Sequence, residues 1–307
     1  MKLSPIVLFV YNRPEHTKKT IEALQKNELA KDSELFIYSD GPKNEDIKEK
    51  VNEVREYIKG IQGFKKITII ERDKNFGLAN NMIQGVSEIF NTFEKVIVLE
   101  DDLVTSKYFL KFMNSTLEFY NGIDKIFVVS GYSHNVKIPK KYFYDVYSSY
   151  RSSSWGWGTW KDRWLQIDWE VKDYEDFIKD KKKIKEFDKS GGLSKMLKNQ
   201  MEGRINSWAI RRTYNQFKLG KYTIFPVVSL VKNIGMDGSG THYNKKSIQY
   251  VQQDGIKFGE FNKDYKFLKE GLEPLELVTK QIRKKTGSKN IFFRIIRKIM
   301  KAFIKYE

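Results

Sequence analysis

The sequence predicts an α/β protein with a mainly parallel central sheet flanked by helices. The first hundred residues alternate four apolar runs of strand length with stretches whose apolar residues recur at helical spacing. Such alternation is typical of parallel strands joined by crossover helices. Each apolar run also ends in polar residues, and ligands of parallel sheets bind beyond the carboxyl ends of the strands. The pattern therefore predicts both the fold class and the edge of the sheet that holds a site.

The elements are predicted in chain order from these runs. Strands are expected at residues 5–11, 34–41, 66–73 and 95–101, and helices at residues 14–27, 44–61 and 76–93. Pro14 supports the first helix start, because proline is favoured in the first helical turn. Strand character returns at residues 221–235. The stretch 180–198 is basic and contains glycines, so we expect it to face solvent.

Polar residues at the four strand ends are the first indication of a site. Two ends are mainly basic or amide-bearing and two are acidic, as the stretches Tyr11 to Arg13, Ser39 to Gly41, Arg72 to Asn75 and Glu100 to Asp102 show. Parallel strands bring these ends to one edge of the sheet. Mg²⁺ and Mn²⁺ prefer oxygen ligands and usually bind through one or two carboxylates plus substrate phosphates. The three consecutive acids after Leu99 therefore predict a Mn²⁺ or Mg²⁺ site that a nucleotide diphosphate completes.

Charge and composition exclude several classes of protein. The chain has no cysteine, which rules out a disulfide scaffold and thiol chemistry and fits a reducing compartment. Pro5 and the charged residues from Arg13 onward do not fit a signal peptide. No stretch approaches the roughly 20 apolar residues that span a bilayer. These features predict a cytoplasmic protein.

The C-terminal residues 280–307 carry about half of the net charge of +17, with ten basic residues and one acid. Residues 290–306 place apolar and basic side chains on opposite faces of a helix; the apolar face holds Phe292, Ile295, Ile296, Ile299 and Phe303. A basic amphipathic helix of this kind suits an anionic membrane surface. The alternative is a helix packed on the protein or on a dimer partner. We expect residues 280–307 to hold the protein on the inner face of the cell membrane.

Six short motifs occur in one order along the chain: "FVYNRP", "SDGP", "DKNFGLANN", "VLEDDL", "SSWGWGTW" and "KNIGMDGSGTH". With this set, residues 3 to 245 resemble the inverting glycosyltransferases of the GT-A fold. The resemblance is to bacterial enzymes of polysaccharide synthesis related to the Golgi N-acetylglucosaminyltransferase that starts complex N-glycans. It implies a Rossmann-like GT-A domain over residues 1–250. Residues 1–105 would bind the nucleotide and residues 106–250 the acceptor, with an extension over 251–279.

The resemblance implies a role for each matching residue. Arg13 would contact the nucleotide diphosphate, and Asp40 would accept a hydrogen bond from the base or a neighbouring group. Glu100 and Asp101 would hold hydroxyl groups of the sugar and ribose, and Asp102 would bind the metal. The expected nucleotide-sugar-binding residues are Tyr11, Arg13, Asp40, Lys74, Asn75, Glu100, Asp101 and Trp157. His242 would complete the metal shell or contact the diphosphate; a structural histidine is the alternative.

The tryptophans of "SSSWGWGTW" allow two interpretations. Trp155, Trp157 and Trp160 alternate with small residues, and the glycines permit close approach of the backbone. They would then wall a sugar pocket. Large indole side chains are mostly buried in any fold, so core packing is the alternative.

The catalytic base is not obvious from the sequence. An inverting transferase needs a carboxylate that takes the proton of the acceptor hydroxyl. The related enzymes place an aspartate before a Ser/Thr-Trp pair, but here the matching residue in "MEGRINSWAIRR" is Asn206. Glu202 would lie near Asn206 if the segment is helical, because the spacing is (i, i+4). Asp237 from the late loop, or a weakened or inactive enzyme, are the alternatives.

The sequence-based hypothesis is a metal-dependent inverting glycosyltransferase. Its partners would be a nucleotide-sugar donor, a lipid-linked or oligosaccharide acceptor and an anionic membrane surface, without nucleic acid. A nucleotidyltransferase is an alternative, although "VYNRPEH" lacks the glycines of a phosphate-binding loop. A nucleic-acid-binding protein would spread its basic residues across the main domain. A catalytically inactive sugar-binding homologue stays open because of Asn206.

Overall fold

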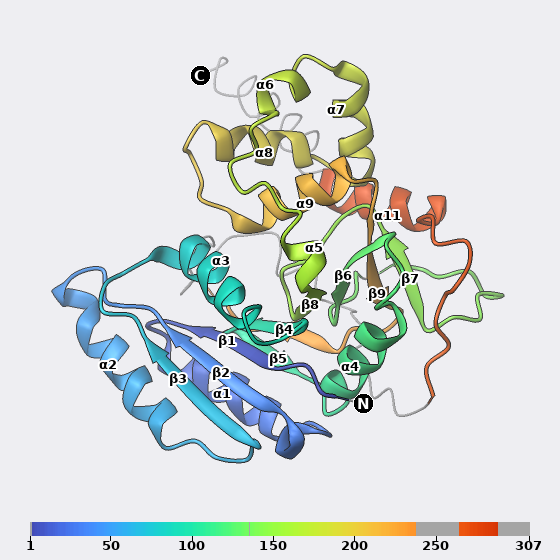
Figure 1. Ribbon diagram of the computed structural model, residues 1–307. Helices are drawn as coiled ribbons and strands as arrows, with labels where there is room; N and C mark the ends of the chain where they lie inside the picture. Colours follow the sequence, from blue (N-terminus) through green and yellow to red (C-terminus); the bar gives the residue numbers. More distant parts are fainter. Residues whose placement is uncertain (1, 135, 238–263, 288–307) are drawn as a thin grey trace, which may run out of the picture.

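The computed structural model describes residues 2–134, 136–237 and 264–287, and its centre is one eight-stranded sheet (Figure 1). The strand order is β3-β2-β1-β4-β8-β6-β9-β7. The strands are β1 (Ile6–Val10), β2 (Glu34–Ser39), β3 (Lys66–Glu71), β4 (Lys95–Glu100), β6 (Ile126–Ser130), β7 (Val146–Ser149), β8 (Trp157–Trp160) and β9 (Tyr222–Pro226). A separate two-stranded sheet joins β5 (Leu103–Thr105) to β10 (Val231–Asn233).

Most strands of the large sheet run in one direction. Strands β3, β2, β1 and β4 are parallel neighbours. Strand β8 is antiparallel to both β4 and β6, so β6 and its parallel neighbour β9 run the same way as β4. Strand β7 is antiparallel to β9. The predicted mainly parallel sheet with flanking helices is therefore confirmed, and a single sheet passes through both predicted halves of the domain.

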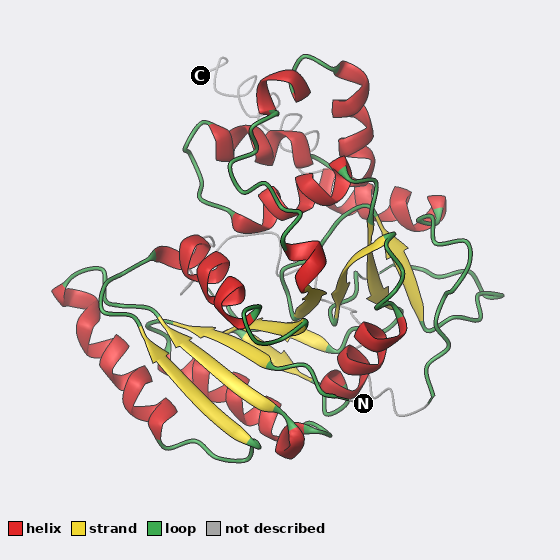
Figure 2. Ribbon diagram, in the orientation of Figure 1, coloured by secondary structure: helices red, strands yellow, loops and turns green. Residues whose placement is uncertain are grey.

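Helices cover both faces of the sheet and form a second group beyond it (Figure 2). Those beside the sheet are α1 (Pro14–Gln25), α2 (Glu45–Lys59), α3 (Gly77–Ile89) and α4 (Phe109–Phe119). The second group holds α5 (Lys161–Trp164), α6 (Tyr174–Phe177), α7 (Lys181–Phe187), α8 (Leu193–Met201), α9 (Trp208–Lys218) and α11 (Glu276–Gly287). Short 3₁₀ turns lie at η1 (Ala30–Asp32) and η2 (Asp188–Ser190). None of the described helices combines the length and the apolar composition needed to cross a bilayer.

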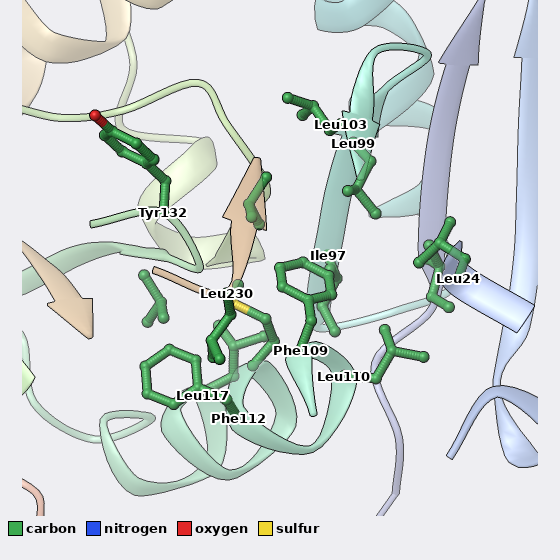
Figure 3. Close-up of a cluster of buried hydrophobic side chains, with 14 of the residues drawn as sticks. Leu24, Ile97, Leu99, Leu103, Phe109, Leu110, Phe112, Leu117, Tyr132 and Leu230 are labelled. Carbon is green, nitrogen blue, oxygen red and sulfur yellow. The ribbon is translucent and has the colours of Figure 1, made fainter. Parts of the chain in front are cut away.

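The apolar strands β1 and β4 are buried on both faces, which explains why their sequences do not alternate with polar residues. Successive side chains of a strand point to opposite faces. Leu8 and Leu99 join the cluster that also contains Leu24 of α1, as Figure 3 shows for Leu24, Leu99 and their neighbours. Phe9 and Val98 join the opposite cluster, which contains the buried residues of α3. The middle of the sheet is therefore fixed between two apolar layers.

Trp157 and Trp160 belong to this core. Their side chains are 0% and 1% exposed. The intervening Gly158 pairs with Ile97 of β4, and a Cβ at Gly158 would lie 2.8 Å from the Val96 carbonyl oxygen. The glycine therefore permits the close contact between strands. The prediction that Trp157 walls a sugar pocket is wrong, because a fully buried indole has no surface left for a ligand.

The lysines of the stretch 180–198 face solvent, as expected, but the stretch also contains α7, η2 and most of α8, and it buries Phe187 and Leu197. Helix α11 crosses the predicted boundary at residue 280, and Val278 and Ile282 pack into the main core. Apolar residues spaced among lysines therefore pack on the protein here. The rest of the predicted membrane helix, residues 288–307, and residues 251–263 of the extension lie outside the described residues.

Candidate active site

An ion-pair cluster lies at the carboxyl ends of the neighbouring strands β1 and β4. Phe9 pairs with Glu100 in the sheet, so the residues that follow both strands meet. Nη2 of Arg13 donates to Oδ1 of Asp101 and, at 3.0 Å, to Oδ2 of Asp102. Burial lowers the pKa of Arg13, but the charges of Asp101 and Asp102 outweigh it and the pKa rises above its ordinary value. The guanidinium is therefore permanently charged between two acids.

We call Glu100, Asp101 and Asp102 the acidic cluster. Its three carboxyl groups outnumber the single positive charge of Arg13. Burial, reinforced by Asp102 and Asp101, raises the pKa of Glu100 to about 8. Burial raises the pKa of Asp101 to about 6, although Arg13 opposes this effect. A further cation would stabilise the ionised carboxylates. The acidic cluster therefore favours the binding of additional positive charge.

The late loop after β10 returns to the acidic cluster. The pairing of β10 with β5 is extended by the N–H of Ile234, which donates to the Asp102 carbonyl at 2.8 Å. Gly235 then passes so close that an added Cβ would lie 2.1 Å from Oδ2 of Asp102 and 2.8 Å from Nη1 of Arg13. Only glycine leaves room for the ion pair at this position. The predicted return of this segment to the site is therefore observed.

Asp237 follows in the same loop and lies 3.2 Å from His16 in an ion pair. The side chain of His16 is 15% exposed. His16 is therefore largely buried beside a partner from a segment more than 200 residues away in the sequence. His242, the predicted metal ligand, lies outside the described residues.

Asp40 anchors the loop that follows β3. Its Oδ1 accepts hydrogen bonds from the N–H groups of Gly41 at 3.0 Å and Phe76 at 2.9 Å. Its Oδ2 accepts from the N–H of Gly77 at 2.9 Å and from Nδ2 of Asn75 at 3.2 Å. A carboxylate offers about four acceptor positions. The protein itself fills them, so Asp40 holds the loop and has no acceptor position left for the predicted hydrogen bond donated by the base or a neighbouring group.

The other predicted nucleotide-binding residues lie around this anchor. Asn75 also donates to the Gly41 carbonyl at 2.8 Å, and a Cβ at Gly41 would lie 2.5 Å from the Lys74 backbone. The side chain of Lys74 is exposed, with its ammonium 5.9 Å from the centre of the Phe76 ring. The hydroxyl of Tyr11 accepts from the N–H of Lys43 at 3.1 Å. Asp40 follows β2, the parallel neighbour of β1, so these residues lie at the same edge of the sheet as Arg13.

Comparisons with known proteins agree with this arrangement. Residues 6–199 match the model of the protein family described as Glycosyl transferase family 2. The chain belongs to glycosyl transferase family 2. No curated protein matches it. The chain therefore has a glycosyltransferase domain of the GT-A fold, whereas a specific relation to the N-acetylglucosaminyltransferase is not shown.

Two solved structures illustrate what this family 2 chain is similar to. One is the mannosyltransferase PcManGT from Pyrobaculum calidifontis in complex with GDP-Man and Mn²⁺, with 12% identity, a TM-score of 0.37, and coverage of 52% of this chain and 45% of that chain. The other is S. aureus TarS 1–349, with 10% identity, a TM-score of 0.41, and coverage of 74% and 59%. The chain thus spans about half of the length of these structures.

The family implies a divalent metal, and Asp102 is the residue that fits one. No three His, Cys, Asp or Glu side chains in the described part of the chain are grouped closely enough to hold a metal ion. Mg²⁺ and Mn²⁺, however, usually bind through one or two carboxylates and take further oxygens from substrate phosphates. Arg13 bonds to Oδ2 of Asp102, which leaves Oδ1 for such a metal. The acidic cluster therefore fits a site that the substrate completes.

Asn206 stands where the resemblance leads us to expect a catalytic base, and its Oδ1 accepts from Nη2 of Arg211 at 3.1 Å. Glu202 does not share a helix with it. Helix α8 ends at Met201, and α9 begins at Trp208 after its N-cap Ser207. Glu202 instead pairs with Arg204 at 2.8 Å. The prediction that a shared helix brings Glu202 near Asn206 is therefore wrong.

Arg212, which was not among the predicted site residues, lies buried between two tryptophans. Its guanidinium carbon is 4.2 Å from the ring centre of Trp157 and 4.7 Å from that of Trp208. Burial lowers the pKa of Arg212 to about 9, and the charge of Glu100 opposes this shift. Arg212 is therefore within electrostatic reach of the acidic cluster. The nearby tryptophans were the available hint, since arginine stacks on indole faces.

We predict that Asp40→Asn loosens the loop at residues 75–77. In this variant an amide nitrogen replaces one carboxylate oxygen. The N–H groups that bonded to that oxygen then lose their acceptor. Unsatisfied buried donors cost about 1–3 kcal/mol each, so the free energy of unfolding should fall by at least that amount. Urea unfolding measures the change, and amide hydrogen exchange at Phe76 and Gly77 should accelerate. The exposed Asp73→Asn serves as the control; equal effects of both substitutions would contradict the anchor role.

Proposed function

We propose that this chain is a metal-dependent inverting glycosyltransferase that moves a sugar from a nucleotide-sugar donor to an acceptor hydroxyl. One observation carries the proposal: in a family 2 domain, Arg13 and the acidic cluster meet at the carboxyl ends of β1 and β4. This edge is where parallel sheets bind ligands. The site offers a guanidinium for a diphosphate beside carboxylates for a metal and for sugar hydroxyls.

Each residue has a role that suits its chemistry. Only Nη2 of Arg13 is bonded to the carboxylates, so Nε and Nη1 keep N–H groups for the donor diphosphate. Asp102 would hold Mn²⁺ or Mg²⁺, which when bound neutralises charge on the departing diphosphate. Glu100 and Asp101 would accept hydrogen bonds from donor hydroxyls. Tyr11, Lys74 and Asn75 would border the nucleotide.

The transfer requires one proton acceptor. The acceptor oxygen forms a bond to the anomeric carbon from the side opposite the diphosphate, the carbon–diphosphate bond breaks, and a carboxylate takes the hydroxyl proton. We propose Asp237 for this step, because the late loop brings it to the residues that flank the acidic cluster. Glu202 is the alternative carboxylate from the sequence, since the neutral amide of Asn206 cannot take the proton.

The acceptor is proposed to be a glycan carried on a lipid or an oligosaccharide in bacterial surface polysaccharide synthesis. The support is the basic amphipathic pattern of residues 288–307, which suits an anionic membrane surface. A peripheral position on the inner face of the cell membrane would bring the site to a lipid-linked acceptor.

We predict that the purified chain hydrolyses at least one of UDP-, GDP- or dTDP-sugars slowly when Mn²⁺ or Mg²⁺ is present. Asp102→Asn should lower this turnover by at least about 10- to 100-fold, because second-shell changes alone have such effects in metal sites. Released nucleotide measures the reaction, with Asp73→Asn as the control. An absence of turnover and of binding for every nucleotide sugar would contradict the proposal and favour an inactive homologue.

We predict that Asp237→Asn lowers sugar transfer by about 10²- to 10⁴-fold, the usual contribution of general base catalysis, with little change in donor affinity. Glu202→Gln should leave transfer within a few-fold of the wild type. Transfer to an acceptor mixture and nucleotide binding by calorimetry are the two measurements. The reverse ranking of the two substitutions would assign the base to Glu202.

We predict that deletion of residues 289–307 moves the protein from anionic liposomes to the soluble fraction. The deleted residues contain six basic side chains besides their apolar face, and each cation near an anionic surface contributes about 1 kcal/mol. Flotation measures the partition, with neutral liposomes as the control. Unchanged flotation of the shortened chain would remove the membrane surface from the proposal.

A further inference from the structure

A cavity of about 270 Å³ lies between the loop before β8 and the helices α8, α9 and α11. Its described lining includes the cationic residues Arg151, Arg212 and Lys285 together with His134, and no aspartate or glutamate is among the described lining residues. We call it the cationic cavity. The absence of acids in its lining contrasts with the site at Arg13, where carboxylates surround the arginine.

Arg212 is the most strongly buried charge in the lining. It is 1% exposed, and Nη2 donates to Oγ of Ser152 at 2.8 Å and to the carbonyl of Ser153 at 2.7 Å. Its Nε and Nη1 have no hydrogen-bond partner in the described part of the chain. A buried charge without partners costs free energy. An anion bound in the cavity would offset part of this cost.

Burial also acts on the other ionisable groups of the lining. Nη1 of Arg151 donates to the Gly191 carbonyl at 2.9 Å, yet burial lowers the pKa of Arg151 to about 10. Burial also lowers the pKa of Lys285. His134 is held neutral, with a pKa lowered by burial to about 3, and its buried Nε2 has no partner among the described residues. Three cations and a neutral imidazole thus converge where burial disfavours positive charge.

The size and the apolar walls indicate more than a small inorganic ion. A volume of about 270 Å³ is many times the roughly 10–15 Å³ that a cavity needs to hold one water molecule. Tyr132 and Trp155 line it with their rings 4.6 Å apart, edge to face. Aromatic faces with nearby hydroxyls, here from Ser152 to Ser154, suit a sugar ring. The cavity therefore combines features for a sugar with features for an anion.

We propose that the cationic cavity binds a sugar unit of the acceptor that carries a phosphate or carboxylate group. Arginine forms bidentate hydrogen bonds with either group. Arg212 lies within electrostatic reach of Glu100, which brings the cavity near the donor end of the sheet. This inference rests on the proposed function and adds to it the chemical class of the acceptor, an acidic glycan.

The test uses glucose 6-phosphate, glucuronate and neutral glucose as probes, with binding to the full chain measured by calorimetry. The wild type should bind at least one acidic probe and should not bind glucose. The probe that binds shows whether the acceptor sugar carries a phosphate or a carboxylate. Lys285→Gln and Arg151→Gln should each weaken that binding about tenfold or more, since one lost charged contact corresponds to about 1.4 kcal/mol or more. The matched control is Lys284→Gln, an exposed lysine of α11 that does not line the cavity.

Nucleotide affinity separates this inference from the proposed function. The affinity for UDP, GDP or dTDP should be the same in Lys285→Gln as in the wild type. A loss of nucleotide affinity in that variant would place the cavity in the donor site and overturn the inference, as would equal weakening by Lys284→Gln. Absent binding of both acidic probes with intact nucleotide-sugar turnover would refute the inference alone, whereas absent turnover would refute the proposed function.

Discussion

The contact of Arg13 with Asp101 and Asp102 is the interaction on which the candidate site depends. It joins the residues after β1 to those after β4, and it requires these two strands to be neighbours in a parallel sheet. The apolar layers on both faces fix that pairing. The ion pair also requires a glycine at position 235, because any side chain there would displace it. Core, sheet order and late loop therefore converge on one buried cluster of charges.

Two electrostatic environments lie close together in this domain. In the acidic cluster, carboxylates outnumber the bonded arginine, and burial raises the pKa of Glu100 and Asp101. In the cationic cavity, burial lowers the pKa of Arg151 and Arg212. In the proposed function the acidic cluster would bind the donor and the cationic cavity the acceptor, so the two ligands would occupy separate sites. Arg212 lies within electrostatic reach of Glu100 and therefore links the two environments.

The support of the site comes from residues whose own hydrogen bonds are complete. The carboxylate of Asp40 accepts hydrogen bonds from the loop at residues 75–77, and Gly41 leaves room for the Lys74 backbone. Such contacts position neighbours such as Asn75 without using the ligand-binding groups themselves. A charged residue at a strand end is therefore not automatically a ligand contact; its partners decide whether it binds or supports.

The sequence by itself determined the strands β1 to β4, the helices between them and the edge that carries the charged residues. The spacing of apolar residues and the residue types at element ends suffice for these features, because both are set by residues close together in the sequence. Only the tertiary structure decided that Trp157 is core, that Asp40 is an anchor, that His16 meets Asp237, and that Arg212 lines a cavity. These outcomes depend on partners far away in the sequence. A side chain's type gives its chemistry, but which acceptors and charges surround it is set by the folded chain.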